Sequence, residues 1–256
     1  GVSEQARARA DALLPGVPVV TPPEVLAAAD LVLLAVPDDA LGPLAAGLAA
    51  TGAVRAGQLL AHPSGRYGTR ILDPATAAGA LPLALHPVMT FTGTSLDLGR
   101  LVGCSFGVTA PEPLRPVAEA LVLEMGGEPV WVAESARPLY HAALAHGSNH
   151  LVTLVAQSMD LLVEAGVADP GRMLAPLLGA SLDNALRTGD LATTGPVVRG
   201  DAGTVLEHVR AIGLVSPEIL ATYRALARAT ADRAIVGHRL QPAAAEALLD
   251  ALAGDP

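Results

Sequence analysis

Short apolar runs alternate with Ala- and Leu-rich helical stretches through the first half of the chain, and this alternation constrains the fold more than any other feature. The runs, which lie between residues 18 and 133, are PVV, LVLLAV, QLLAH, LPLALH, SFGVTA and PVWVA. Strands that alternate with helices need crossover connections, which build a mostly parallel sheet. The run LVLLAV, at 31 to 36, is apolar throughout, which is typical of a central strand covered on both faces. The sequence therefore predicts an α/β domain for residues 1 to 134.

The second half of the chain has no strand-like runs. Helices are predicted at 137 to 165, 170 to 188, 201 to 213, 216 to 236 and 242 to 253. We therefore expect an all-helical domain over residues 135 to 256. An earlier helix start is also legible, because Thr21, Pro22 and Glu24 form the T-x-x-E pattern of a capping box.

Composition and charge exclude several classes of partner. The hydrophobic fraction is 51% and the mean hydropathy is +0.45, yet the apolar runs are too short to span a bilayer. The formal net charge of −9 repels phosphate backbones and anionic lipid. Aromatic residues make up only 2%, too few for a base-stacking platform. We therefore expect a small-molecule substrate, with neither nucleic acid nor membrane as partner.

Amino-acid usage also limits the chemistry and the compartment. All 16 basic residues are arginine, which excludes a catalytic lysine or a Schiff base. Cys104 is the only cysteine, so neither an internal disulfide nor a cysteine metal cluster can form. Such usage is typical of a reducing compartment. We predict a cytoplasmic protein with Cys104 in its core.

Three predicted strands end in unusually polar or small residues. The segments are VPDD at 36 to 39, HPSG at 62 to 65 and HPVMTF at 86 to 91. Ligands of such sheets bind outside the carboxyl ends of the strands, so each segment is a candidate dinucleotide contact. Pro37 and Asp38 can begin a helix whose free N–H groups meet an anion, although ordinary capping alone explains them better. Gly65 allows close backbone approach and Ser64 offers a donor, although a plain turn fits the same residues.

No G-x-G-x-x-G motif occurs in the sequence, which by itself counts against a dinucleotide-binding fold. The opening GVSEQARARA nevertheless fits the tail of a second Rossmann strand and the helix after it, with a glycine unit of about 30 residues upstream. We therefore expect an N-terminally incomplete Rossmann-type sheet. In this register Ser3 replaces the acidic residue of NAD-specific folds, and Arg7 or Arg9 can meet a ribose phosphate, which favours NADP. Solvated charges on a frayed terminus are the alternative.

A polar stripe runs along the predicted helix at 137 to 165, which is otherwise apolar. At about 100° per residue, the stripe contains His146, Asn149, His150, Thr153, Gln157 and Asp160. It faces water, a dimer seam or a ligand cleft. His146 and His150 have the i, i+4 spacing of a zinc site, but the sequence lacks the HExxH glutamate and a nearby third ligand. No metal site is expected.

Six segments together resemble a family of predicted bacterial oxidoreductases. They are ADLVLLAVPDDAL, HPSG, LPLALHPVMTFTG, GCSFGVTAPEPLRPVAEAL, YHAALAHGSNHLVTL and TTGPVVRGDAGTV. This family combines a Rossmann-like N-terminal half with a helical domain of unknown function, and it is related to pyrroline-5-carboxylate reductase, 6-phosphogluconate dehydrogenase and ketopantoate reductase. The resemblance covers nearly the whole chain. It implies NADP binding and dimerisation through the helical half, and some relatives resemble an alternative ketopantoate reductase of pantothenate biosynthesis.

The resemblance also implies roles for particular residues. The cofactor edge would contain Val36, Pro37 and Asp38, and the residues near the nicotinamide would be His62, Ser64 and Gly65. Asn149 would face the substrate. The wider superfamily often has a lysine four residues before that asparagine, where this chain has Ala145, so His141 is our substitute candidate.

The loop TGPVVRGD resembles the turn of pyrroline-5-carboxylate reductase that closes on substrate. This resemblance makes Thr194, Arg199 and Asp201 candidates for binding and orienting a carboxylate. A structural ion pair, with Asp201 as a helix cap, is the alternative.

The predicted reaction is hydride transfer from NADPH to the carbonyl of a small 2-oxo acid, with ketopantoate preferred. Arg199 would hold the carboxylate, Asn149 would orient the carbonyl, and His141 would donate the proton. His146 is the alternative donor, and His86 is assigned to the substrate site. Reduction of a cyclic imine and a non-catalytic NADP-binding sensor stay open as alternatives. The apolar helices also predict a homodimer.

Overall fold

The computed structural model describes residues 4 to 253 of the chain. The chain divides into two compact units, Gly1–Asn149 and His150–Pro256, which are joined within one long helix, α7 (Arg137–Glu164). The domain boundary predicted near residue 135 lies just before this helix begins. Ser3, which was predicted to favour NADP, lies outside the described residues.

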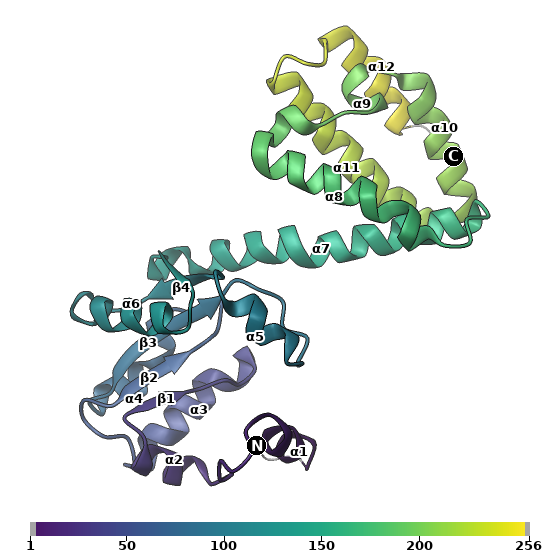
Figure 1. The fold of residues 1–256 in the computed structure, drawn as a ribbon. Helices are drawn as coiled ribbons and strands as arrows, with labels where there is room; N and C mark the ends of the chain where they lie inside the picture. The colour runs from purple at the N-terminus through teal and green to yellow at the C-terminus, as the bar shows by residue number, and fades with distance from the viewer. Residues whose placement is uncertain (1–3, 254–256) are drawn as a thin grey trace. The chain divides into compact units, whose positions relative to one another are not determined.

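A five-stranded sheet forms the centre of the first unit (Figure 1). Its strands β1 to β5 lie side by side in chain order and span Leu31–Leu33, Leu59–His62, Leu81–Pro87, Ser105–Thr109 and Glu128–Trp131. Only the pair of β3 and β4 is antiparallel, so the predicted, mostly parallel α/β sheet is confirmed. Because β1, β2 and β3 are parallel, their carboxyl ends share one edge of the sheet.

Two details of the strand prediction are wrong. The run PVV at 18 to 20 pairs with no described strand, and Val19 and Val20 stay 43% and 42% exposed. The run LVLLAV is not covered on both faces among the described residues, where β1 pairs only with β2 at the edge of the sheet. Its burial alternates, since Val32 is buried while Leu31 is exposed. Among the described residues, therefore, no layer covers one face of this apolar strand.

Helices pack on the sheet and bury its side chains in two clusters. The helices α1 to α6 span Glu4–Leu13, Pro22–Ala28, Asp38–Ala50, Asp73–Ala77, Leu96–Leu101 and Arg115–Glu124. Leu41 of α3 belongs to the same cluster as Leu60 of β2. Val122 of α6 belongs to a second cluster, with Phe106 of β4. Cys104 lies in this second cluster, buried and unpaired, as the sequence predicts.

The capping box at the start of α2 is confirmed. The Glu24 carboxylate accepts hydrogen bonds from the backbone N–H of Thr21, at 2.7 Å, and from its hydroxyl, at 2.6 Å. The hydroxyl and then the backbone of Thr21 lower the pKa of Glu24 from its ordinary value. The helix therefore begins where the T-x-x-E pattern predicts.

Arg137 is the first residue of α7 and is wholly buried at the centre of the first unit. Its guanidinium donates to the hydroxyl of Thr109, at 2.8 Å, and to three backbone carbonyls, those of Ser64 (3.2 Å), Ala84 (3.1 Å) and Gly107 (2.9 Å). Burial lowers the pKa of Arg137, while Tyr140 and Glu134 act in the opposite direction. One side chain thus joins α7 to β3, β4 and the loop after β2.

The second unit is built from helices among its described residues (Figure 1). After α7, the helices α8 to α12 span Pro170–Thr188, Pro196–Arg199, Ala202–Val215, Pro217–Val236 and Pro242–Ala253. The five helices predicted from the sequence are therefore confirmed. Val205 and Val209 of α10 are wholly buried with Leu248 and Leu252 of α12 in one core. No described helix is long and apolar enough to cross a membrane.

Replacing Arg137 by methionine should lower the free energy of unfolding of the first unit by about 3 kcal/mol, because three buried carbonyls lose their donor. Urea unfolding followed by the fluorescence of Trp131, the only tryptophan, measures this loss. The matched control is Arg66→Met, because Arg66 is exposed and its guanidinium lies 4.9 Å from the Tyr67 ring centroid. The control should cost less than about 1 kcal/mol. Equal losses in the two variants would contradict the central role of Arg137.

Candidate functional site

A cavity of about 430 Å³ brings together three of the residues predicted for the substrate site. Its lining consists of His86, Val88, Met89, Thr90, His141, Leu144, Ala145, Ser148 and Asn149. His86 comes from the carboxyl end of β3, and His141 and Asn149 come from α7. The predicted pair of His141 and Asn149 therefore does face one cavity. Ala145 lies in the same lining.

Tyr140 fixes the orientation of His86 and was not predicted from the sequence. Its hydroxyl lies 2.8 Å from His86 Nδ1, and the two rings meet edge to face at 5.6 Å and 87°. A Cβ at Gly107 would lie 2.2 Å from the Tyr140 oxygen, so only glycine fits beside it. A glycine in the middle of the strand SFGVT was the available signal, since it marks a close approach.

The hydrogen bond between Tyr140 and His86 links the phenol proton to the tautomer of the ring. Burial raises the pKa of Tyr140, while the Arg137 cation and a backbone hydrogen bond from Gly107 act in the opposite direction. Tyr140 and His86 Nδ1 share one hydrogen bond at 2.8 Å, and either atom can be the donor, depending on the tautomer of the ring. In the tautomer in which Tyr140 donates, the ring proton of neutral His86 lies on Nε2.

The charge of His86 is set by its surroundings. Burial, followed by the Arg137 cation and by His141, lowers the pKa of His86 to about 4. At neutral pH the ring is therefore uncharged, and it offers an N–H donor rather than a cation. A neutral donor suits a carbonyl oxygen.

Gly65 allows the loop after β2 to meet both imidazoles. A Cβ at this position would lie 2.7 Å from His141 Cδ2 and 2.9 Å from His86 Nε2. The His86 and His141 rings stand 6.3 Å apart at 87°. The backbone at Gly65 thus approaches both imidazoles closely, whereas its predicted contact with a nicotinamide stays a prediction.

His62 has a structural position at the end of β2, directly before the same loop. Its side chain is wholly buried, with Nε2 at 2.9 Å from the carbonyl oxygen of Gly68 and Nδ1 accepting from the N–H of Ser64 at 3.2 Å. Burial lowers the pKa of His62. Both ring nitrogens are engaged, so any cofactor contact predicted here would come from the loop backbone or from Ser64.

The first cofactor segment lies at the start of α3. Pro37 precedes the helix, and Asp38 and Asp39 occupy its first turn, so the helix start predicted for this segment is confirmed, without a side-chain capping hydrogen bond. Val36 and Arg7 both line a cavity of about 850 Å³ beside β1. The sheet edge, Gly65 and the free N–H groups of α3 fit the nicotinamide end of a dinucleotide. The sequence contains no G-x-G-x-x-G loop to hold a pyrophosphate.

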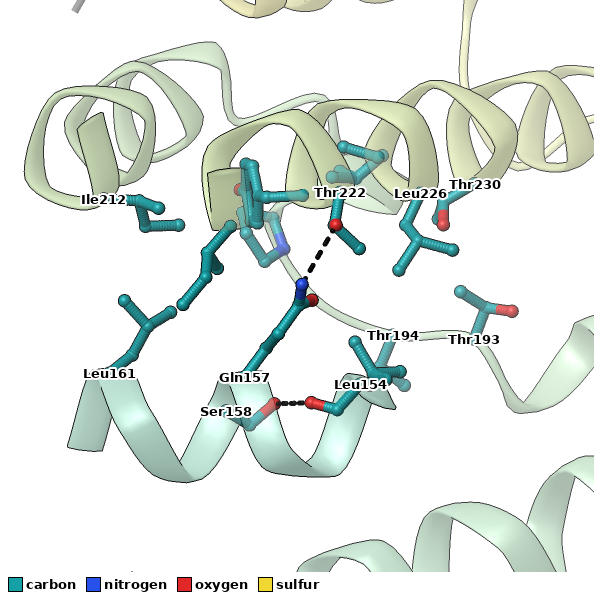
Figure 2. Close-up of a pocket in the computed structure, with 15 residues that line it drawn as sticks. Leu154, Gln157, Ser158, Leu161, Thr193, Thr194, Ile212, Thr222, Leu226 and Thr230 are labelled. Atoms are coloured by element: carbon teal, nitrogen blue, oxygen red, sulfur yellow. Dashed lines mark hydrogen bonds between the residues drawn. The ribbon is translucent and has the colours of Figure 1, made fainter. Parts of the chain in front are cut away.

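The predicted loop residues of the second unit have three different environments. Thr194 lines a cavity of about 290 Å³, together with Gln157 and Thr222 (Figure 2). Arg199 is exposed at the end of α9 and is not part of that lining. Asp201 caps α10 through the N–H and the hydroxyl of Thr204, at 3.1 and 2.8 Å. These hydrogen bonds lower the pKa of Asp201, and the helix-cap alternative is confirmed.

The alternative proton donor, His146, lies on α7 within the first unit, and its side chain is exposed. It is not among the residues that line the cavity of His86 and His141. No group of three or more His, Cys, Asp or Glu residues suited to a metal ion occurs among the described residues.

The stability of the first unit should fall as the pH is lowered from about 6.5 to about 4. In the unfolded chain His86 has an ordinary pKa and is protonated in this window. In the folded protein its pKa is about 4, so the imidazole stays neutral there. His62 acts in the same direction. Because His86 is partly exposed, its share should be about 1 kcal/mol. Urea unfolding at pH 7 and pH 5 measures the loss, and His86→Gln should reduce it. A loss unchanged in that variant would exclude His86 as its source.

Two family models match successive parts of the chain. Residues 1–87 match a family model described as a Rossmann-like domain. Residues 104–230 match the model of a domain of unknown function, DUF2520. No curated protein matches the chain.

Solved structures with the same fold include several proteins named as reductases. BF3122 of Bacteroides fragilis, a candidate NADP oxidoreductase, is 20% identical, with a TM-score of 0.66 over 81% of this chain and 78% of that one. An imine reductase of Streptomyces aurantiacus is 18% identical, with a TM-score of 0.59 over 96% and 82%. Pyrroline carboxylate reductase of Plasmodium falciparum, with NADP bound, is 13% identical, with a TM-score of 0.52 over 91% and 81%.

At these identities the likeness concerns the fold. The family resemblance inferred from the six sequence segments is confirmed by the two family models. This chain carries a Rossmann-like domain followed by a DUF2520 domain.

Proposed function

We propose that the protein is an NADP-dependent oxidoreductase that reduces the carbonyl group of a small 2-oxo acid, with ketopantoate as the preferred substrate. The observation that carries this proposal is the cavity lined by His86, His141 and Asn149 at the carboxyl edge of a Rossmann-type sheet. Ligands of such sheets bind at this edge. Structures of similar fold are named as NADP-dependent or NADP-bound reductases, which supports the same cofactor here.

In this proposal the chain's own residues bind and protonate the substrate. NADPH, when bound, supplies the hydride that reaches the carbonyl carbon. His86, neutral and protonated on Nε2, donates a hydrogen bond to the carbonyl oxygen, and Asn149 orients the same group. His141 delivers the proton that the oxygen needs once the hydride has been transferred.

The two domains have different roles in this proposal. Residues 1–134 would bind the cofactor, and residues 135–256 would bind substrate and form the dimer. The exposed Arg7 of α1 favours NADP over NAD, because its guanidinium can pair with a ribose phosphate. A reducing, cytoplasmic location fits the single unpaired cysteine.

Reduction of a cyclic imine is the second candidate function. It is favoured by the likeness to imine reductases of Streptomyces aurantiacus and Myxococcus stipitatus and to pyrroline carboxylate reductase. A sensor that binds NADP without catalysis is the third, because Ala145 stands where related enzymes often have lysine. Turnover of a 2-oxo acid and of a cyclic imine distinguishes the three candidate functions.

The proposed homodimer rests on exposed apolar side chains in the second unit. Val152 and Val163 of α7 are 69% and 56% exposed, and Met173 and Leu177 of α8 are 56% and 62% exposed. Two residues that are eleven positions apart on a helix point in directions within about 20° of each other. The two valines therefore share one side of α7. A patch of this kind is typical of an interface between copies.

His141→Ala and Asn149→Ala should each reduce turnover by about 100-fold while the Tm stays within a few degrees, because each would remove a substrate contact. Consumption of NADPH by the purified natural protein, with ketopantoate and with a cyclic imine in parallel, measures the effect. Faster turnover of the imine would favour the second function. NADPH binding without turnover across a broad substrate screen would favour the sensor.

The control for these variants is Asn184→Ala, which removes an exposed amide from α8 and should leave turnover unchanged. If His141→Ala and Asn149→Ala unfold early but keep full activity per folded molecule, the two residues stabilise the fold instead. The proton donor would then be sought at His146 or His86.

Val163→Glu should convert the dimer to a monomer, because two buried carboxylates would meet across the apolar patch. Light scattering at micromolar concentration measures the mass of both proteins. The control is Val236→Glu, at the exposed end of α11, where the parent residue is 80% exposed. A monomeric parent protein would contradict the proposed dimer.

A further inference from the structure

The second unit contains a cavity of about 290 Å³ that the proposed reaction does not use (Figure 2). Its walls come from α7, from the segment around Thr193 and Thr194, and from α10 and α11. Most of the lining is aliphatic, including Leu154, Ile212 and Leu226. Among the described residues that line it, no side chain carries a formal charge.

Gln157 is the polar group that points to a ligand. Its Nε2 donates to the hydroxyl of Thr222 at 3.2 Å, which holds the amide between α7 and α11 (Figure 2). Its Oε1 is buried and has no hydrogen-bond partner among the described residues. A buried acceptor without a donor is unfavourable, so packing alone does not explain why this side chain is present on an apolar helix.

We propose that this cavity binds a small uncharged molecule with a compact apolar body and one N–H or O–H group. This group donates a hydrogen bond to Gln157 Oε1. An ion is disfavoured, because the lining offers no opposite charge to offset its desolvation. The volume lies at the lower end of the range of ligand pockets, which limits the ligand to a few ring atoms or a short chain. Small lactams and alcohols belong to this class.

A homodimer of the proposed kind leaves the cavity open. Gln157 and Leu154 face the cavity from α7, whereas the exposed Val152 and Val163 lie more than about 100° around the same helix from Gln157. The valines are not part of the cavity lining. One side of α7 can therefore meet a second copy while the other side meets a ligand.

Binding of 2-pyrrolidinone tests the proposal, because this lactam is uncharged, compact and carries one N–H. Methyl NMR of the full chain should show saturable shifts at lining residues such as Ile212 and Leu226. N-methyl-2-pyrrolidinone has the same ring without the donor and should bind about tenfold more weakly. Equal affinities for the two lactams, or no saturable shift, would overturn the proposal.

Gln157→Leu should abolish the difference between the two lactams, because it removes the acceptor and keeps the side-chain size. The Tm of this variant should not fall, since a buried, unpartnered oxygen is removed with the amide. The control is Asn184→Leu, an amide-to-leucine change on α8 outside the cavity, which should keep the tenfold difference. Contacts between copies at the lining methyls in intermolecular NOE spectra would overturn the proposal, because a second chain would then fill the cavity.

Discussion

The buried guanidinium of Arg137 is the interaction on which the first unit depends. A cation without exposure is tolerated only when its donors are satisfied, and here four hydrogen bonds reach the Thr109 hydroxyl and the carbonyls of Ser64, Ala84 and Gly107. These acceptors belong to different elements, so the first turn of α7 is held against the sheet and the loop after β2.

The candidate site follows from that attachment. Tyr140 and His141 come one helical turn after Arg137, so the position of Arg137 largely decides where their rings lie. Gly107 and Gly65 then make room, one for the Tyr140 hydroxyl and the other for the two imidazoles. The same cation, next after burial, lowers the pKa of His86 and keeps that ring neutral. Arg137 therefore influences both where the side chains of this cavity lie and whether His86 is charged.

Polar residues of the second unit divide into those that stabilise the fold and those whose bonding is incomplete. Asp201 uses both carboxylate oxygens to cap α10, which accounts for its position without a ligand. Gln157 keeps a buried oxygen without a partner, which packing does not explain. Sequence reasoning grouped both residues as candidates for ligand chemistry or for structure, because a side chain's identity does not reveal how many of its hydrogen bonds are made.

The α/β-then-helical order, the five helices after residue 135 and the capping box at Thr21 can be predicted from the sequence, because they follow from local periodicity and short-range hydrogen bonds. The sequence did not reveal that one face of β1 stays uncovered among the described residues, since apolarity does not say which layers pack on a strand. Nor did it reveal Tyr140 or the fourfold bonding of Arg137, whose partners lie up to 73 residues away in the chain. These contacts follow from tertiary packing, because they depend on which backbone carbonyls and glycines the folded sheet brings to the start of α7.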